Sequence, residues 1–97
     1  MVLTFDDIKE NSVIEIAKKM MLAARTAPKA RGTDNIHMLL LIDEDIKKLA
    51  AHMKIIAQRD QVAFFERDAN NIEQASAVVL FGTPFKSLGL KNCGWCG

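Results

Sequence analysis

The sequence predicts an α/β domain, a small helix–sheet sandwich with two or three covered, parallel strands. Two short apolar runs, residues 37–42 and 77–81, have the length and continuity of strands buried on both faces. Segments with helical spacing of apolar residues precede and separate them, and this alternation is typical of parallel sheets. We expect residues 1–97 to form a single α/β domain, or a fragment of one, with a cysteine-containing tail over residues 85–97.

The composition is that of a globular chain. Of the 97 residues, 49% are hydrophobic and 26% are charged, which excludes a disordered tail. The net charge is only +1, so we expect neither a nucleic acid nor an acidic membrane as a partner. No apolar run approaches the roughly 20 residues of a membrane span. The first residues carry acids where a signal peptide needs a basic start, which predicts a cytoplasmic protein.

The first helix is expected over residues 11–26, with apolar side chains on more than one face. Ser12 and Glu15 fit a capping box at its start, and Thr4 with Asp7 is a second candidate one or two turns earlier. A helix that is apolar this far round is expected to be buried on two sides, by its own domain and by a partner subunit. The apolar positions are Val13, Ile14, Ile16, Ala17, Met20, Met21 and Ala24.

A loop over residues 29–35 follows, because Pro28 pushes the preceding residue out of the helical region. Gly32 and Asn35 in this loop can both take the left-handed conformation that sharp turns require. The strand at residues 37–42 comes next.

The second helix is expected over residues 44–59, with Asp43 as its N-cap. Its apolar residues form a single stripe, which predicts a surface helix with one inward face. The stripe of this second helix consists of Ile46, Leu49, Ala50, Met53, Ile56 and Ala57.

After the second helix, weaker patterns predict a short strand at residues 62–65 and a short helix at residues 66–74.

Two groups of residues are candidates for chemistry. Cys93 and Cys96 form a C-x-x-C, a spacing that lets two thiolates ligate one metal ion or iron–sulfur cluster, although a redox dithiol or a pair of inert thiols are alternatives. Arg25, Lys29 and Arg31 cluster at the end of the first helix and can receive a phosphate, as in a flavin or nucleotide. The simpler interpretation is that these cations interact with the helix macrodipole.

Three stretches carry a resemblance to a known family: AARTAPKARGTDNIHMLLLIDEDIKKLA, RDANNIEQASAVVLFG and the ending GLKNCGWCG. Together they resemble a group of prokaryotic proteins that are described as containing a ferredoxin domain and whose function is not known. In that family further cysteines follow, so the resemblance implies that Cys93 and Cys96 are the first two ligands of an iron–sulfur cluster. A [4Fe–4S] cluster takes four thiolates, and this chain has two.

The segment AARTAPKARGTDN followed by HMLLLIDED is also similar to the start of the nitroreductase fold, whose members are FMN-binding dimers. This second resemblance implies a flavin site near Arg25, Lys29 and Asn35. The sequence departs from the pattern, because Lys29 replaces the usual serine and Asn35 comes several residues late.

Three hypotheses follow. The leading one is an iron–sulfur protein of electron transfer or redox chemistry, in which Cys93 and Cys96 are ligands and Arg25, Lys29 and Arg31 can receive an anionic cofactor. The second is a non-catalytic dimeric assembly domain that pairs through the face bearing Met20 and Met21. Two such chains hold four cysteines, enough for one tetrahedral zinc. The third is an FMN-dependent reductase.

Overall fold

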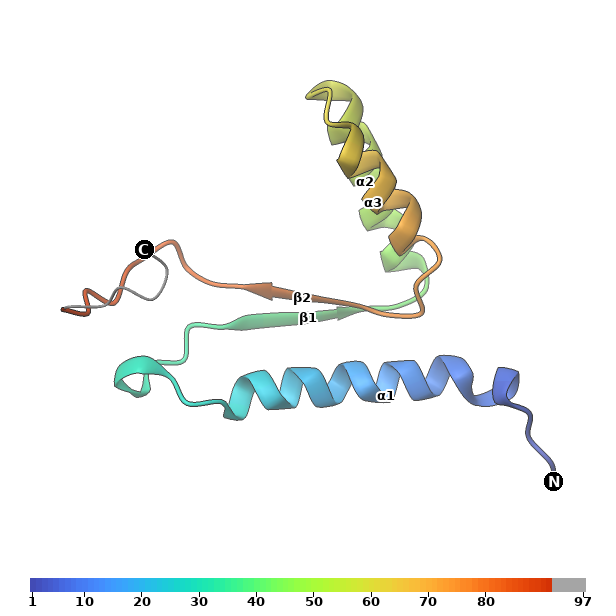
Figure 1. Ribbon diagram of the computed structural model, residues 1–97, viewed down its shortest axis with the longest axis horizontal. Coiled ribbons are helices and arrows are strands. Elements are labelled where there is room, and N and C mark those ends of the chain that lie inside the picture. The colour runs from blue at the N-terminus through green and yellow to red at the C-terminus, as the bar shows by residue number, and fades with distance from the viewer. Residues whose placement is uncertain (92–97) are drawn as a thin grey trace.

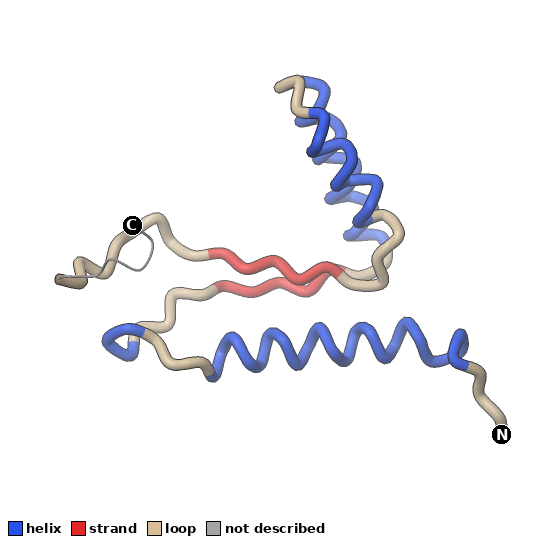
Figure 2. Tube along the Cα trace, viewed as in Figure 1, coloured by secondary structure: helices blue, strands red, loops and turns tan. Residues whose placement is uncertain are grey.

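The computed structural model describes residues 1–91, which form a mixed α/β fold with an antiparallel two-stranded sheet (Figure 1). The chain is open: its radius of gyration is 17.6 Å, whereas a compact domain of this length has about 13 Å. Figure 2 shows the helix α1 alongside the two strands, and a helical hairpin projecting from the far end of the sheet. The elements are α1 (Phe5–Thr26), the 3-10 turn η1 (Ala30–Gly32), β1 (His37–Leu41), α2 (Glu44–Arg59), α3 (Ala63–Ile72) and β2 (Val78–Gly82).

α1 begins at the earlier of its two predicted starts. The backbone N–H of Asp7 donates to the Thr4 hydroxyl at 3.3 Å, and the Asp7 carboxylate accepts from the Thr4 N–H at 2.8 Å, which completes a capping box. The prediction of Ser12 as N-cap is therefore wrong, since Ser12 lies inside the helix. The helix ends at Thr26, ahead of Pro28, as the sequence predicted.

The two strands run antiparallel, with His37 opposite Gly82 and Leu41 opposite Val78, so the prediction of parallel strands is wrong. Two helices separate the strands, as predicted, and the second of them begins at Ala63 instead of residue 66. α2 and α3 run in opposite directions and return the chain to the sheet end that it left. The reversal is a Schellman-type turn, in which Gln61 has φ 55° and the N–H of Val62 donates to the Ala57 carbonyl at 2.9 Å.

The short strand predicted at residues 62–65 is absent, because these residues complete that turn and open α3. α2 itself has the predicted bounds. Its Asp43 occupies the N-cap position, but the side chain makes no capping hydrogen bond and the backbone has φ 50°. The predicted stripe of α2 is its inward face, where Ile46, Ala50 and Ala57 are buried. α2 packs against α3, in which Ala69 is buried.

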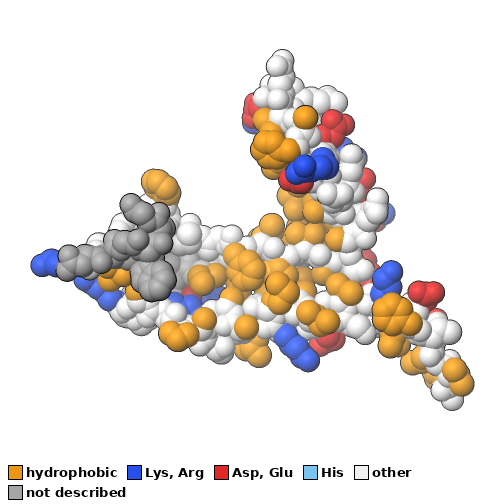
Figure 3. Space-filling view, in the orientation of Figure 1, with side chains coloured by type: hydrophobic (Ala, Val, Ile, Leu, Met, Phe, Trp, Pro, Cys, Tyr) orange, Lys and Arg blue, Asp and Glu red, His pale blue; other side chains and the backbone are white. Residues whose placement is uncertain are grey.

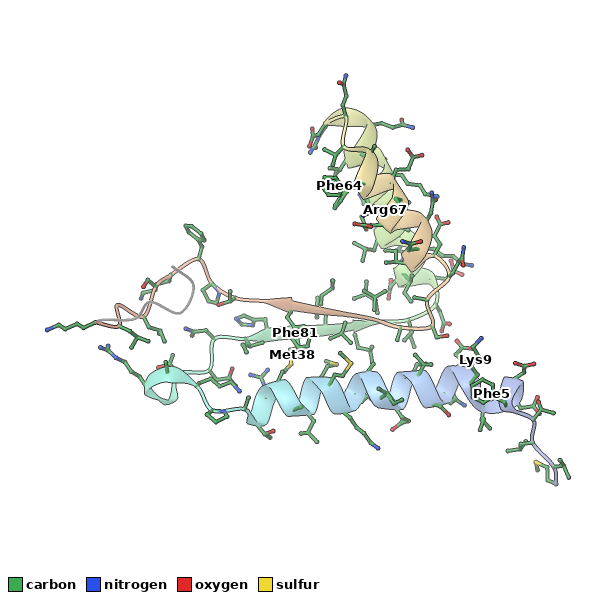
Figure 4. All side chains as sticks on the ribbon, viewed as in Figure 1. Phe5, Lys9, Met38, Phe64, Arg67 and Phe81 are labelled. Carbon is green, nitrogen blue, oxygen red and sulfur yellow. The ribbon has the colours of Figure 1, made fainter. Side chains whose placement is uncertain are left out.

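Only one face of the sheet is covered by α1. Met38 of β1 pairs with Phe81 of β2, and both lie on the side of the sheet toward α1 (Figure 4). Leu39 and Leu80 pair on the opposite face, where they are 62% and 37% exposed. The apolar runs predicted strands covered on both faces. That prediction is wrong for the described part of the chain, in which α1 covers one face of the sheet and no helix covers the other.

None of the helices in residues 1–91 combines the length and hydrophobicity that a bilayer crossing requires.

Candidate functional site

The two predicted site segments leave the sheet at the same end. β1 begins at His37 and β2 ends at Gly82, and these residues are partners in the antiparallel ladder. The loop of residues 25–35, here called the basic loop, leads into β1, and residues 83–91 lead away from β2 toward the cysteines (Figure 1). Cys93 and Cys96 lie outside the described residues, so their assignment as metal ligands stays a prediction.

Lys29 closes the C-terminal end of α1. Its ammonium group donates to three carbonyl oxygens, those of Ala24, Arg25 and Ala27, and the last two lie at 2.8 and 2.7 Å. These carbonyls have no partner within the helix ladder or stand just beyond it, so the cation satisfies them and opposes the negative end of the macrodipole. All three ammonium hydrogens are engaged, and an anion at Lys29 has to compete with these carbonyls.

Arg25 is engaged with Asp34 across the same loop. The guanidinium donates to the Asp34 carboxylate at 2.7 Å, and the other carboxylate oxygen accepts from the N–H of Ile36 at 3.2 Å. The hydrogen bond from Arg25 and the one from Ile36 hold the pKa of Asp34 below its ordinary value. The pair therefore ties the end of α1 to the residues that lead into β1.

Arg31 has the most accessible charge of the predicted site residues. It is exposed, with φ 57°, and within residues 1–91 its guanidinium makes no hydrogen bond or ion pair. Gly32 has φ 64°, as predicted. Asn35 is half-buried and is not in the left-handed conformation, which Arg31 and Gly32 take in this loop. The basic loop thus offers one uncommitted cation, and the prediction of a flavin phosphate there stays a prediction.

A second charged region lies at the far end of the sheet and was not predicted. It is a shallow cleft of about 220 Å³ whose lining includes the acids Glu10, Asp43, Glu44 and Glu73 and one cation, Lys47. Within the described ranges no three His, Cys, Asp or Glu side chains are arranged to hold a metal ion. The acids come from separate parts of the chain, so no local pattern in the sequence could reveal the cleft.

Comparisons with known proteins leave the family open. No family model matches the chain, and no solved structure matches it. A protein of Archaeoglobus fulgidus that is described as uncharacterized is 34% identical over 97 residues, which is all of this chain and 52% of that protein. The chain therefore spans about half the length of the curated relative it matches. The resemblances to ferredoxin-domain proteins and to nitroreductases stay predictions.

Proposed function

We propose that the chain serves iron–sulfur electron transfer, with Cys93 and Cys96 as two of the cluster ligands. The observation that supports this proposal most directly is the pairing of His37 with Gly82. Because of that pairing, the basic loop and the segment that leads to the cysteines leave the sheet at the same end. A cluster held by thiolates is an anion, and nearby cations stabilise it and favour its reduced form.

The chain by itself supplies half of a four-thiolate coordination sphere. Its sequence contains two cysteines, and the residues described by the structure contain none. The other two ligands therefore come from outside these 97 residues. When bound, the cluster would supply one-electron chemistry, and Arg31 would contribute positive charge near it.

Anaerobic reconstitution with ferrous iron and sulfide tests the proposal. The buffer includes a small thiol, which supplies the ligands that the chain lacks. We expect the wild-type chain to bind iron and sulfide and to gain visible charge-transfer absorbance. The double variant Cys93→Ser/Cys96→Ser should lose both, whereas Ser87→Ala, in the same segment, should retain them. In the reconstituted protein, Arg31→Gln should lower the reduction potential.

Two results would contradict the proposal. One is a colourless wild-type chain that carries neither iron nor sulfide after reconstitution. The other is one tightly bound zinc per two chains that iron does not displace, which would favour a structural zinc site between two copies.

A further inference from the structure

α1 carries two apolar stripes, and its own sheet covers only one of them. The sheet-facing stripe consists of half-buried or buried residues, Ile14, Ala17, Met21 and Ala24. The outer stripe consists of Val13, Ile16 and Met20, which are spaced three and four residues apart and therefore share another side of the helix. Ile16 is 59% exposed and Met20 is 53% exposed. Figure 3 shows hydrophobic side chains gathered over α1 and the adjoining sheet.

The exposed area matches what a stable dimer buries. The chain has 8061 Å² of accessible surface, whereas a compact protein of 10.8 kDa has about 5,500 Å². The excess is about 2,500 Å² per chain. Obligate dimers bury roughly 2,000–5,000 Å² in total, or about half of that on each copy. The excess per chain therefore equals the upper limit of this range, and an interface on α1 would bury part of it.

The charges of α1 indicate the orientation of that second copy. The first half of the helix, residues 5–15, contains four acids and one lysine, and the second half, residues 16–26, contains three cations and no acid. The acidic cleft, which includes Glu10, lies toward the first half, and the basic loop follows the second half. Opposite charges face each other only when two such helices run antiparallel.

We propose that two copies of this chain pair through the outer stripe, with their α1 helices antiparallel about a two-fold axis near Ile16. Ile16 lies at the middle of the 22-residue helix, so the two helices overlap along their full length. The pairing is isologous, and the basic loop of each copy lies near the acidic cleft of the other. Val13 of one copy then lies near Met20 of the other.

This interface is independent of the proposed iron–sulfur site. A helix of 22 residues is about 33 Å long, and the segment that leads to the cysteines leaves the sheet near its C-terminal end. In the antiparallel pair the two segments of residues 83–91 therefore leave the two sheets at opposite ends of the dimer. The two proposals rest on different residues, and either can fail without the other.

The first experiment measures mass by light scattering on the Cys93→Ser/Cys96→Ser chain, so that metal and disulfide play no part. We expect twice the 10.8 kDa of one chain. Ile16→Glu should give monomers, because a charge in the centre of the interface is left without a partner. Leu22→Glu is the matched control: Leu22 is 63% exposed on another side of α1, so this variant should stay dimeric.

The second experiment tests the orientation by disulfide cross-linking in the same background. Ile16→Cys places two thiols next to the two-fold axis, and we expect oxidation to link them. Ala23→Cys should not link, because seven residues from the axis the two Cα atoms are about 20 Å apart in an antiparallel pair. A disulfide requires about 7 Å or less.

Several outcomes would overturn the proposal. A monomeric chain at millimolar concentration would do so, and so would a dimer that Ile16→Glu leaves intact. Efficient cross-linking of the Ala23→Cys chain as well as the Ile16→Cys chain would indicate parallel helices. A chain that becomes compact and monomeric when fused to the unmatched portion of the Archaeoglobus relative would assign the outer stripe to that portion.

Discussion

The helical hairpin and the α1–sheet layer differ in how far each satisfies its own apolar pattern. In the hairpin, α2 and α3 enclose a small interior in which Ala50 and Ala69 are fully buried. In the α1–sheet layer, Ala17 is buried, but Ile16, Leu39 and Phe81 remain largely exposed. The difference lies in what the fold brings against each face.

A helix with one apolar stripe needs one covering element, whereas a helix with two apolar stripes needs two. α2 has a single stripe, and the helix that follows it covers that stripe after a tight turn. α1 has two stripes, and a sheet of two short strands is too narrow to cover both. The inward stripe of α2 is therefore covered within the chain, although Ile55 and Phe64 remain exposed on the outside of the hairpin. The outer stripe of α1 is not covered by any element of residues 1–91.

The largest stability effect is expected in the interior of the hairpin. Ala50→Leu inserts three carbons where the helices leave no space, and we expect a loss of about 1–3 kcal/mol in the free energy of unfolding. Ala51→Leu adds the same atoms at the exposed neighbouring position and should change it by less than about 0.5 kcal/mol. Urea denaturation at one fixed protein concentration measures both. Equal effects would show that the hairpin is not closely packed.

A smaller effect is expected where α1 meets the sheet. Met21 is half-buried on the sheet-facing stripe, and Met21→Ala should cost about 1–2 kcal/mol, below the range for a fully buried methionine. Met20→Ala should leave the unfolding of the monomer nearly unchanged and should raise the dimer dissociation constant. Dilution series by urea denaturation and sedimentation separate the two. If Met20→Ala destabilised the monomer and Met21→Ala weakened the dimer, the sheet would pack on the stripe that bears Met20.

Capping of α1 should contribute about 1 kcal/mol. Thr4→Ala removes the hydroxyl that accepts from the Asp7 N–H, and substitutions of this kind usually cost about that much. Ser12→Ala changes an exposed residue inside the helix and should be neutral or slightly stabilising. Thermal unfolding followed by circular dichroism compares them. A larger cost for Ser12→Ala would support a helix that starts near residue 11.

The smallest effect concerns pH. Because Arg25 holds the pKa of Asp34 below its unfolded value, this pair stabilises the fold above about pH 4 and the contribution is lost as the pH falls through the lowered pKa. Arg25→Gln should make stability less dependent on pH between about pH 4 and 2. Arg31→Gln, which removes an equal charge from the same loop, should retain the wild-type slope. Urea midpoints across this range provide the measurement.

Much of the local structure was predictable because it depends on neighbours in the sequence. The bounds of α2 and its inward residues follow from helical spacing, and Pro28 explains the end of α1. The start of α1 was ambiguous because the sequence contains two capping-box patterns. Thr4 forms the cap with an extended backbone, whereas Ser12 lies inside the helix. The 62–65 segment was misassigned because a left-handed Gln61 is not a typical turn signal.

The residues of the candidate site were predictable from the sequence, but their hydrogen bonds and ion pairs were not. The sequence places Arg25, Lys29 and Arg31 in one loop, but it does not show that Lys29 binds the helix carbonyls or that Arg25 binds Asp34. The acidic cleft depends on residues from three separate segments. Residues that are distant in the sequence come together through long-range contacts, and periodicity and capping patterns carry no information about those contacts.

By itself, the sequence determined the bounds and inward stripe of α2, the end of α1 and the excess of apolar residues on α1, because backbone hydrogen bonding and side-chain periodicity act over a few residues. The tertiary structure alone decided the direction of β2, the bare face of the sheet and the separation of charge between its two ends. Those features depend on where the Gln61 turn sends the chain, and a single change of direction there moves every contact that follows.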